Sequence, residues 1–155
     1  MVWGAICEPG WEVMNGARRA APSDLSELKE LVRAFYEIDR HEYDEARVSA
    51  ALAPLLEDDS HGQVWVVPVT GPLAGYAVVT WSWSLESGGR DAILDEIYVE
   101  EQGQGSGSEL LLHAVRSAAE TGAARMYLET ESHNFRVRRF YERNGFTPDD
   151  SIWMS

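Results

Sequence analysis

The sequence has few of the residues that build disulfide frameworks or metal centres. Its single cysteine, Cys7, cannot form an internal disulfide, and the four histidines show neither an HExxH motif nor paired ligand spacing. We therefore expect no metal site. A serine hydrolase is not supported either, because the GxSxG motif around Ser106 would require glycines where the chain has Gln104 and Ser108.

Long apolar runs and basic residues are also scarce. No run approaches the roughly 20 apolar residues of a membrane-spanning helix. Residues 1–7 are too short for a signal peptide and lack its charged flank, so we expect a cytoplasmic protein. The 13 basic and 26 acidic residues give a net charge of −13, which disfavours nucleic acid and anionic membranes as partners. A cationic partner is favoured, although solubility explains an acidic surface equally well.

The chain length fits one domain with its own core, which we assign to residues 1–155 with a loosely structured N-terminal segment at 1–16. Apolar residues at helical spacing predict a first helix from Asp24, with a capping box that includes Glu27. A second helix is predicted after Asp44, and Pro54 should kink or divide it.

Segments rich in β-branched and aromatic residues predict strands at 64–69, 76–84 and 93–99, of which the second packs on one side only. After a helical crossover, residues 124–129 should form a strand parallel to 93–99. Another helix and a short strand at 152–154 follow. The pattern predicts an α/β (α+β) fold.

A glycine-rich loop lies between the strand at 93–99 and the next amphipathic helix. Gly103, Gly105 and Gly107 allow positive φ and leave backbone N–H groups open, so the loop and the helix N-terminus suit a phosphate. A triphosphatase loop is excluded, because it would require a lysine that this segment lacks. A dinucleotide fingerprint is weakened by Ser108 in place of glycine, although Glu129 stands where that motif has its acid.

The pattern QxxGxG at Gln102, Gly105 and Gly107 resembles the coenzyme A loop of the GNAT superfamily, the GCN5-related N-acetyltransferases. A second stretch, from 128 to 146, is similar to another motif of that superfamily: a strand, an asparagine, a helix with a tyrosine and a Gly-Phe stop. One departure is that only two residues separate Val99 from Gln102, where family members usually have two more. The region 85–96 looks like an uncharacterised bacterial branch related to histone and polyamine acetyltransferases.

The resemblance implies a GNAT fold, with a central mixed, mostly antiparallel sheet, a splayed parallel pair of strands and about four flanking helices. It implies acetyl-CoA as the acyl donor and no metal. The positions expected to contact the coenzyme are Ile97, Tyr98, Val99, Gln102, Gly103, Gln104, Gly105, Ser106, Gly107, Ser108, Asn134 and Tyr141.

The same resemblance implies the catalytic residues. Tyr141 follows Asn134 by seven residues, at the position of the family's tyrosine that protonates the departing thiolate. Two carboxylates, Glu96 and Glu129, are candidates for the general base, with Asp95 in reserve, and a chain of water molecules could replace them. Burial of a carboxylate would raise its pKa toward a useful value.

The expected reaction is acetyl transfer to a primary amine of a small, cationic acceptor by direct attack in a ternary complex. Acid-rich residues 37–45 could select such an amine, although an exposed turn is their simpler explanation. Acetylation of a protein or peptide, and an acyl-CoA sensor without turnover, remain alternatives, as does a dinucleotide-binding protein. A homodimer through the last strand is possible.

Overall fold

The structure is a computed structural model that describes residues 16–68, 72–103 and 105–150. In these segments, five strands form one sheet in the order β1-β2-β3-β4-β5, and every neighbouring pair is antiparallel except β4 and β5. This arrangement confirms the predicted mixed, mostly antiparallel sheet. The strands are β1 (Arg18–Arg19), β2 (Gly62–Pro68), β3 (Leu73–Ser84), β4 (Gly89–Val99) and β5 (Met126–Leu128).

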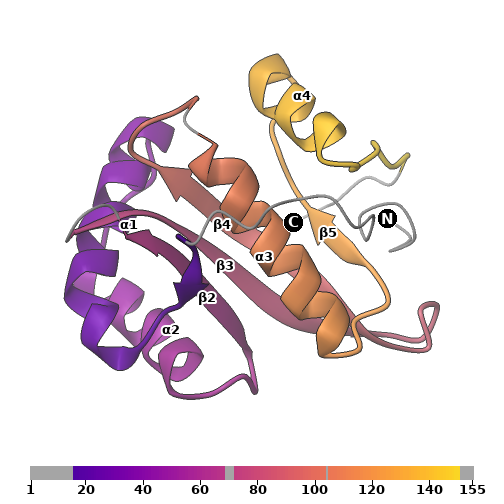
Figure 1. Cartoon of the computed structure of the whole chain (residues 1–155), viewed down its shortest axis with the longest axis horizontal. Coiled ribbons are helices and arrows are strands. Elements are labelled where there is room, and N and C mark those ends of the chain that lie inside the picture. Colours follow the sequence, from indigo (N-terminus) through magenta and orange to yellow (C-terminus); the bar gives the residue numbers. More distant parts are fainter. Residues whose placement is uncertain (1–15, 69–71, 104, 151–155) are drawn as a thin grey trace.

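Four α-helices and one short 3-10 helix flank the sheet within the described part of the chain. They are η2 (Pro22–Asp24), α1 (Leu25–Asp39), α2 (Glu45–Glu57), α3 (Ser106–Glu120) and α4 (Phe135–Arg143). Helices α1 and α2 pack on one face of the sheet, α3 crosses the other face, and α4 lies beyond β5 (Figure 1). The N-terminal residues 1–15 and the strand expected at 152–154, with the dimer contact proposed for it, lie outside the described residues.

Both faces of β3 are buried, which corrects the expectation that one side alone packs. Tyr76 and Val78 belong to a core cluster with α1 and α2, whereas Ala77 and Val79 belong to a cluster with α3. All four side chains are at most 5% exposed. A strand with helices on both faces loses the apolar and polar alternation of a half-exposed strand, so its sequence pattern does not distinguish the two cases.

The predicted helix starts are only partly correct. Asp44 caps α2 as expected, because its side chain accepts a hydrogen bond from the Arg47 N–H. Asp24, by contrast, makes no cap bond to α1, since its carboxylate accepts from the Ala21 N–H and pairs with Arg18 at 2.7 Å. The predicted capping box with Glu27 is therefore absent.

The expected division of α2 is also wrong, because the helix runs unbroken from Glu45 to Glu57. Pro54 lies in the last turn of this helix. There its missing N–H and its ring disturb a single hydrogen bond, rather than a ladder that continues beyond it.

One irregularity in β4 shapes the centre of the molecule. Val78 pairs with Glu96 and Val79 pairs with Leu94, so Asp95 is an extra residue that forms a β-bulge. Leu94 therefore faces α3, but after the bulge Glu96 faces α1 instead of continuing the same alternation. The parallel pairing with β5 ends at Leu94 as well, so β4 and β5 separate beyond this point, as expected for a splayed pair.

Candidate active site

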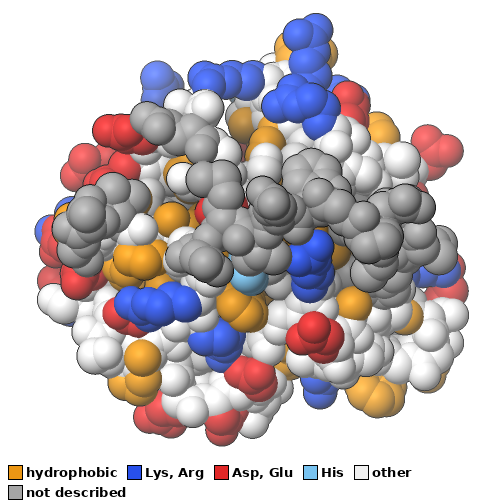
Figure 2. All heavy atoms as spheres, in the orientation of Figure 1, with side chains coloured by type: hydrophobic (Ala, Val, Ile, Leu, Met, Phe, Trp, Pro, Cys, Tyr) orange, Lys and Arg blue, Asp and Glu red, His pale blue; other side chains and the backbone are white. Residues whose placement is uncertain are grey.

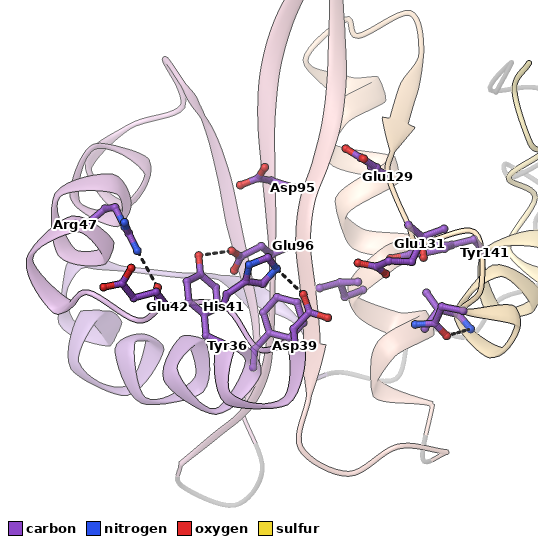
Figure 3. Close-up of a pocket in the computed structure, with 15 residues that line it drawn as sticks. Tyr36, Asp39, His41, Glu42, Arg47, Asp95, Glu96, Glu129, Glu131 and Tyr141 are labelled. Carbon is purple, nitrogen blue, oxygen red and sulfur yellow. Dashed lines mark hydrogen bonds and ion pairs between the residues drawn. The ribbon is translucent and has the colours of Figure 1, made fainter. Parts of the chain in front are cut away.

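A cavity of about 700 Å³ opens where β4 and β5 separate. One wall comes from α1, α2 and the loop between them, the floor comes from β4, and the other wall comes from the segment after β5 and from α4 (Figure 3). The lining residues are Phe35, Tyr36, Asp39, His41, Glu42, Arg47, Asp95, Glu96, Ile97, Glu129, Thr130, Glu131, Asn134, Val137 and Tyr141.

Glu96 is the most constrained carboxylate of the cavity. Its Oε1 accepts a hydrogen bond of 2.8 Å from the Tyr36 hydroxyl, and its Oε2 accepts one of 2.7 Å from the Tyr76 hydroxyl (Figure 3 shows the first). Burial raises the pKa of Glu96, and the two hydroxyl donors oppose this shift in part. Glu96 is therefore oriented at the floor with a raised pKa, as a proton acceptor requires.

Tyr141 lies on the opposite wall. It is 8% exposed, and burial raises its pKa to about 12. Its ring packs edge-on against Phe146, and among the described residues its hydroxyl has no hydrogen-bond partner. The cavity therefore contains a phenol that stays protonated at neutral pH and is free to donate.

Asn134 begins the helix that carries Tyr141. Its side-chain oxygen accepts a 3.3 Å hydrogen bond from the Val137 N–H, so it caps α4. Gly145, at φ 86°, follows the helix end. The strand, asparagine, helix and glycine of the second motif thus form one continuous unit that places Tyr141 in the cavity.

The other two candidate acids line the cavity but are more exposed. Glu129 follows the end of β5 and is exposed, with no hydrogen-bond partner among the described residues. Asp95 is also exposed to the cavity, whose walls displace part of its water and so raise its pKa. The structure therefore brings Glu96, Glu129 and Tyr141 to one cavity but constrains only Glu96 by hydrogen bonds.

The cavity is strongly acidic. Six of its described lining residues carry carboxylates, and the basic ones among them are Arg47 and His41, which pairs with Asp39 at 2.6 Å. Asp39, His41 and Glu42 come from the acid-rich segment 37–45, for which an exposed turn was the simpler explanation and which spans the end of α1 and the loop to α2. The structure places these side chains on the cavity wall, so the segment is both exposed and part of the site.

The glycine loop leads into a helix without a side-chain cap. Gly103 and Gly105 have φ of 91° and 90°, and a Cβ at either position would contact nothing within 4 Å. Gly105 is the N-cap of α3 and supplies no side-chain bond, whereas Asp44 and Asn134 cap α2 and α4. The first-turn N–H groups of α3 have no partner within the helix, so they suit an anion.

The end of this loop lies beside β4 and α4. A Cβ on Gly107 would lie 3.7 Å from the Phe140 ring and 4.0 Å from Val99 Cγ2. Ile97, Asn134 and Tyr141 line the cavity, whereas the described loop residues Gln102 to Ser108 do not, and Gln104 is outside the described residues. Apart from Gln104 and the side chain of Tyr98, the predicted coenzyme positions thus form a strip from the α3 N-terminus to the cavity.

Tyr98 differs from its predicted neighbours. Its ring centroid lies 5.8 Å from that of Phe35 and 6.2 Å from that of Tyr76, on the face covered by α1. The side chain of Tyr98 therefore serves the core on that face, and only its backbone is left for a contact with the coenzyme.

Sequence reasoning missed Tyr36 and Tyr76. The two tyrosines precede Glu96 by 60 and 20 residues, respectively. Each sits in a stretch whose apolar spacing explains a tyrosine as core, so no local signal connects either one to Glu96.

Comparisons with known proteins agree with this geometry. The model of the acetyltransferase (GNAT) family matches residues 25–146. The uncharacterized N-acetyltransferase YhfO of Bacillus subtilis (strain 168) is 29% identical over 134 residues, which cover 85% of this chain and 89% of that protein. A putative acetyltransferase from Arthrobacter sp. FB24 has a solved structure that is 26% identical, with a TM-score of 0.77 and coverage of 94% and 95%.

The structure of AAC(6')-Iy in complex with the bisubstrate analog CoA-S-monomethyl-acetylneamine is 16% identical, with a TM-score of 0.78 and coverage of 90% of this chain and 95% of that one. At this identity the likeness concerns the fold alone.

The splayed sheet, the glycine loop and the family match together define an acyl-CoA-dependent acetyltransferase. More particularly, the chain belongs to the acetyltransferase (GNAT) family. Among the described residues, no group of three or more His, Cys, Asp or Glu side chains is arranged to hold a metal ion. None of the helices in the described segments has the length and apolar character needed to cross a membrane.

Proposed function

We propose that the protein transfers the acetyl group of acetyl-CoA to a primary amine of a small, cationic acceptor bound in the acidic cavity, by direct attack in a ternary complex. The observation that carries this proposal is the cavity itself, with six carboxylates around a volume of about 700 Å³. That volume is typical of small-molecule sites. AAC(6')-Iy, whose structure contains a CoA-acetylneamine bisubstrate analog, supports an amine acceptor in this fold.

The donor would be held by the strip described above. The open N–H groups at the start of α3, with Gly103 and Gly105, fit the pyrophosphate of acetyl-CoA. Four arginines on α4 offset the acidic character of the protein near this region, and Figure 2 shows Lys and Arg side chains at the edge where α4 lies in Figure 1. Acetyl-CoA supplies the acetyl group as a thioester.

The residues of the cavity would move two protons. Glu96 accepts a proton from the acceptor ammonium, which frees the nitrogen lone pair for attack on the carbonyl carbon. As the C–N bond forms and the C–S bond breaks, Tyr141 donates its hydroxyl proton to the departing sulfur. The nitrogen loses its second proton, which returns to the Tyr141 phenolate through water, and Glu96 releases the proton that it accepted to solvent. The products are the acetylated amine and the free thiol. Asn134 supports this step by fixing the start of the helix that carries Tyr141.

The acceptor class can be tested by measuring thiol release with a panel of amines. We expect kcat/KM to be highest with a di- or polyamine or an aminoglycoside, lower with a lysine peptide and lowest with a neutral monoamine. Because the attraction is between charges, KM for the polyamine should rise as salt increases from about 0.05 to 0.5 M. Equal activity with a neutral amine would contradict a cationic acceptor, and preference for the peptide would favour a protein substrate.

A charge-removal variant tests the same point. We expect Glu42→Gln combined with Glu131→Gln to raise KM for a polyamine by about tenfold, because each exposed carboxylate contributes modestly. The matched control is Glu57→Gln combined with Glu120→Gln, which removes two exposed acids outside the cavity. If both double variants raise KM equally, the net charge of the protein attracts the acceptor and the cavity walls do not select it.

Substitution of Gly105 tests the donor site. Gly105→Ala forces a side chain into φ 90°, which costs about 1 kcal/mol and should turn the N–H groups of the loop away from their common target. We expect the Kd for acetyl-CoA, measured by isothermal titration calorimetry, to rise at least about tenfold. Gly88→Ala at φ 75°, in the β3–β4 hairpin, imposes similar strain and should leave this Kd unchanged. Unaltered binding in Gly105→Ala would place the pyrophosphate elsewhere.

A further inference from the structure

We infer that Tyr36 of α1, together with Tyr76 of β3, is a positioning residue for acetyl transfer, because the two hydroxyls hold the Glu96 carboxylate in one orientation at the cavity floor. This inference rests on the proposed role of Glu96 as the proton acceptor. It adds that one side chain, Tyr36, both forms part of the cavity wall that faces the acceptor and donates a hydrogen bond to the base, Glu96.

The hydrogen-bond geometry selects the ionised carboxylate. An ionised glutamate only accepts hydrogen bonds, and each tyrosine hydroxyl has one hydrogen to donate. Tyr36 donates to Oε1 at 2.8 Å and Tyr76 donates to Oε2 at 2.7 Å, so both hydrogens are used by the anion. Each carboxylate oxygen keeps a further lone pair, which is available to an ammonium group in the cavity. Protonation of Glu96 would remove at least one of these acceptor sites.

The two tyrosines differ in their surroundings. Tyr76 is fully buried in the core beneath α1, and burial raises its pKa well above the ordinary value, so it is a fixed neutral donor. Tyr36 is half-buried and lines the cavity, and burial with its bond to Glu96 raises its pKa to about 12. The ring centroid of Tyr36 also lies 5.6 Å from that of His41, so Tyr36 belongs to the cavity wall that faces the acceptor.

Other charged groups act on Glu96 from the surrounding elements. On β4 itself, Asp95 raises the pKa of Glu96, and His41 on the α1–α2 loop lowers it. His41 is paired with Asp39, and the charge of Arg47 on α2 lowers the pKa of Tyr36, against the larger effects that raise it. From the side of β5, the carboxylates of Glu129 and Glu131 line the same cavity. Burial outweighs the two hydroxyl donors, so loss of one donor should raise the pKa of Glu96 further.

The test compares Tyr36→Phe with Tyr43→Phe. Tyr43 is a matched control because its ring packs edge-on against that of Tyr36, with the ring centroids 6.3 Å apart. Its buried hydroxyl has no hydrogen-bond partner among the described residues. The readout is the pH profile of kcat/KM for acetylation of a polyamine. We expect Tyr36→Phe to move the acidic limb upward by about one pH unit, with Tyr76→Phe moving it in the same direction.

Several outcomes are separable. A shift of one pH unit means that, at pH values below the limb, kcat/KM of Tyr36→Phe is about tenfold lower than that of the wild type. This loss should disappear as pH rises, and the Kd for acetyl-CoA should be unchanged. A purely structural role would lower Tm and leave the limb in place. If Tyr36→Phe and Tyr43→Phe have the same pH profile of kcat/KM while Glu96→Gln is inactive, the positioning role of Tyr36 is refuted and the base role of Glu96 stands. If Glu96→Gln retains full activity, the proposed base fails and the inference fails with it.

Discussion

Glu96→Gln is expected to lower kcat/KM for acetyl transfer by about 100- to 10,000-fold, the range that a general base contributes. The substitution keeps the size of the side chain and can keep one acceptor for a tyrosine hydroxyl, but the amide cannot accept a proton from an ammonium group. The Kd for acetyl-CoA should stay near that of the wild type, since Glu96 faces α1 and not the glycine loop. Steady-state thiol release and calorimetry measure the two quantities.

The controls for this prediction are the other two carboxylates. Glu129→Gln and Asp95→Asn should each change kcat/KM by less than about tenfold, because these exposed side chains contribute charge alone. A large loss in Glu129→Gln with an active Glu96→Gln would transfer the base role to the end of β5. Similar small losses in all three variants would indicate a base supplied by water.

The pH dependence follows from the sign of the shift. A base acts in its deprotonated form, and burial raises the pKa of Glu96, so kcat/KM should rise with pH through a limb above the usual range of a glutamate. Glu96→Gln should lose this limb.

Tyr141→Phe is expected to lower kcat by about 100-fold, because the departing sulfur loses its proton donor. The ring and its contacts with Phe140 and Phe146 are retained, so Tm should change little. The pKa of Tyr141 is about 12, and the hydroxyl therefore remains protonated between about pH 7 and 10, so no falling limb from this group is expected in that range. Single-turnover measurements with saturating acetyl-CoA isolate this step.

Tyr127→Phe is a suitable control for Tyr141→Phe. Tyr127 lies on β5 outside the cavity lining, where its hydroxyl accepts a hydrogen bond from Arg125. We expect this variant to keep the wild-type kcat. Equal rates for Tyr141→Phe and the wild type would show that the thiolate leaves unprotonated or takes its proton from water.

Much of the fold was predictable because its signals are local. Asp44 and Asn134 cap α2 and α4 through bonds to residues three positions ahead, and Gly105 and Gly122 take the positive φ that their turns require. Chain order and the helical crossover also predict the parallel pairing of β4 with β5. These features depend on a few neighbouring residues, so the sequence pattern is enough to find them.

Other predictions were wrong for the opposite reason. Asp24 has the spacing of a helix cap, but Arg18 and Ala21 use its carboxylate. The second face of β3 is buried because helices arrive on both sides, which the alternation of its own residues does not show. In each case a partner distant from the pattern changed the outcome.

The sequence by itself determined the family motifs, the helix that presents Tyr141 and the glycine loop before α3, since each is built from adjacent residues. Tertiary structure alone decided which carboxylate of the cavity is held in place by hydrogen bonds. The bulge at Asp95 is a mismatch between the registers of two strands, and it turns Glu96 toward α1. Tyr36 and Tyr76 then reach its two oxygens from separate elements, because hydrogen bonds depend on distance in space and not on separation along the chain.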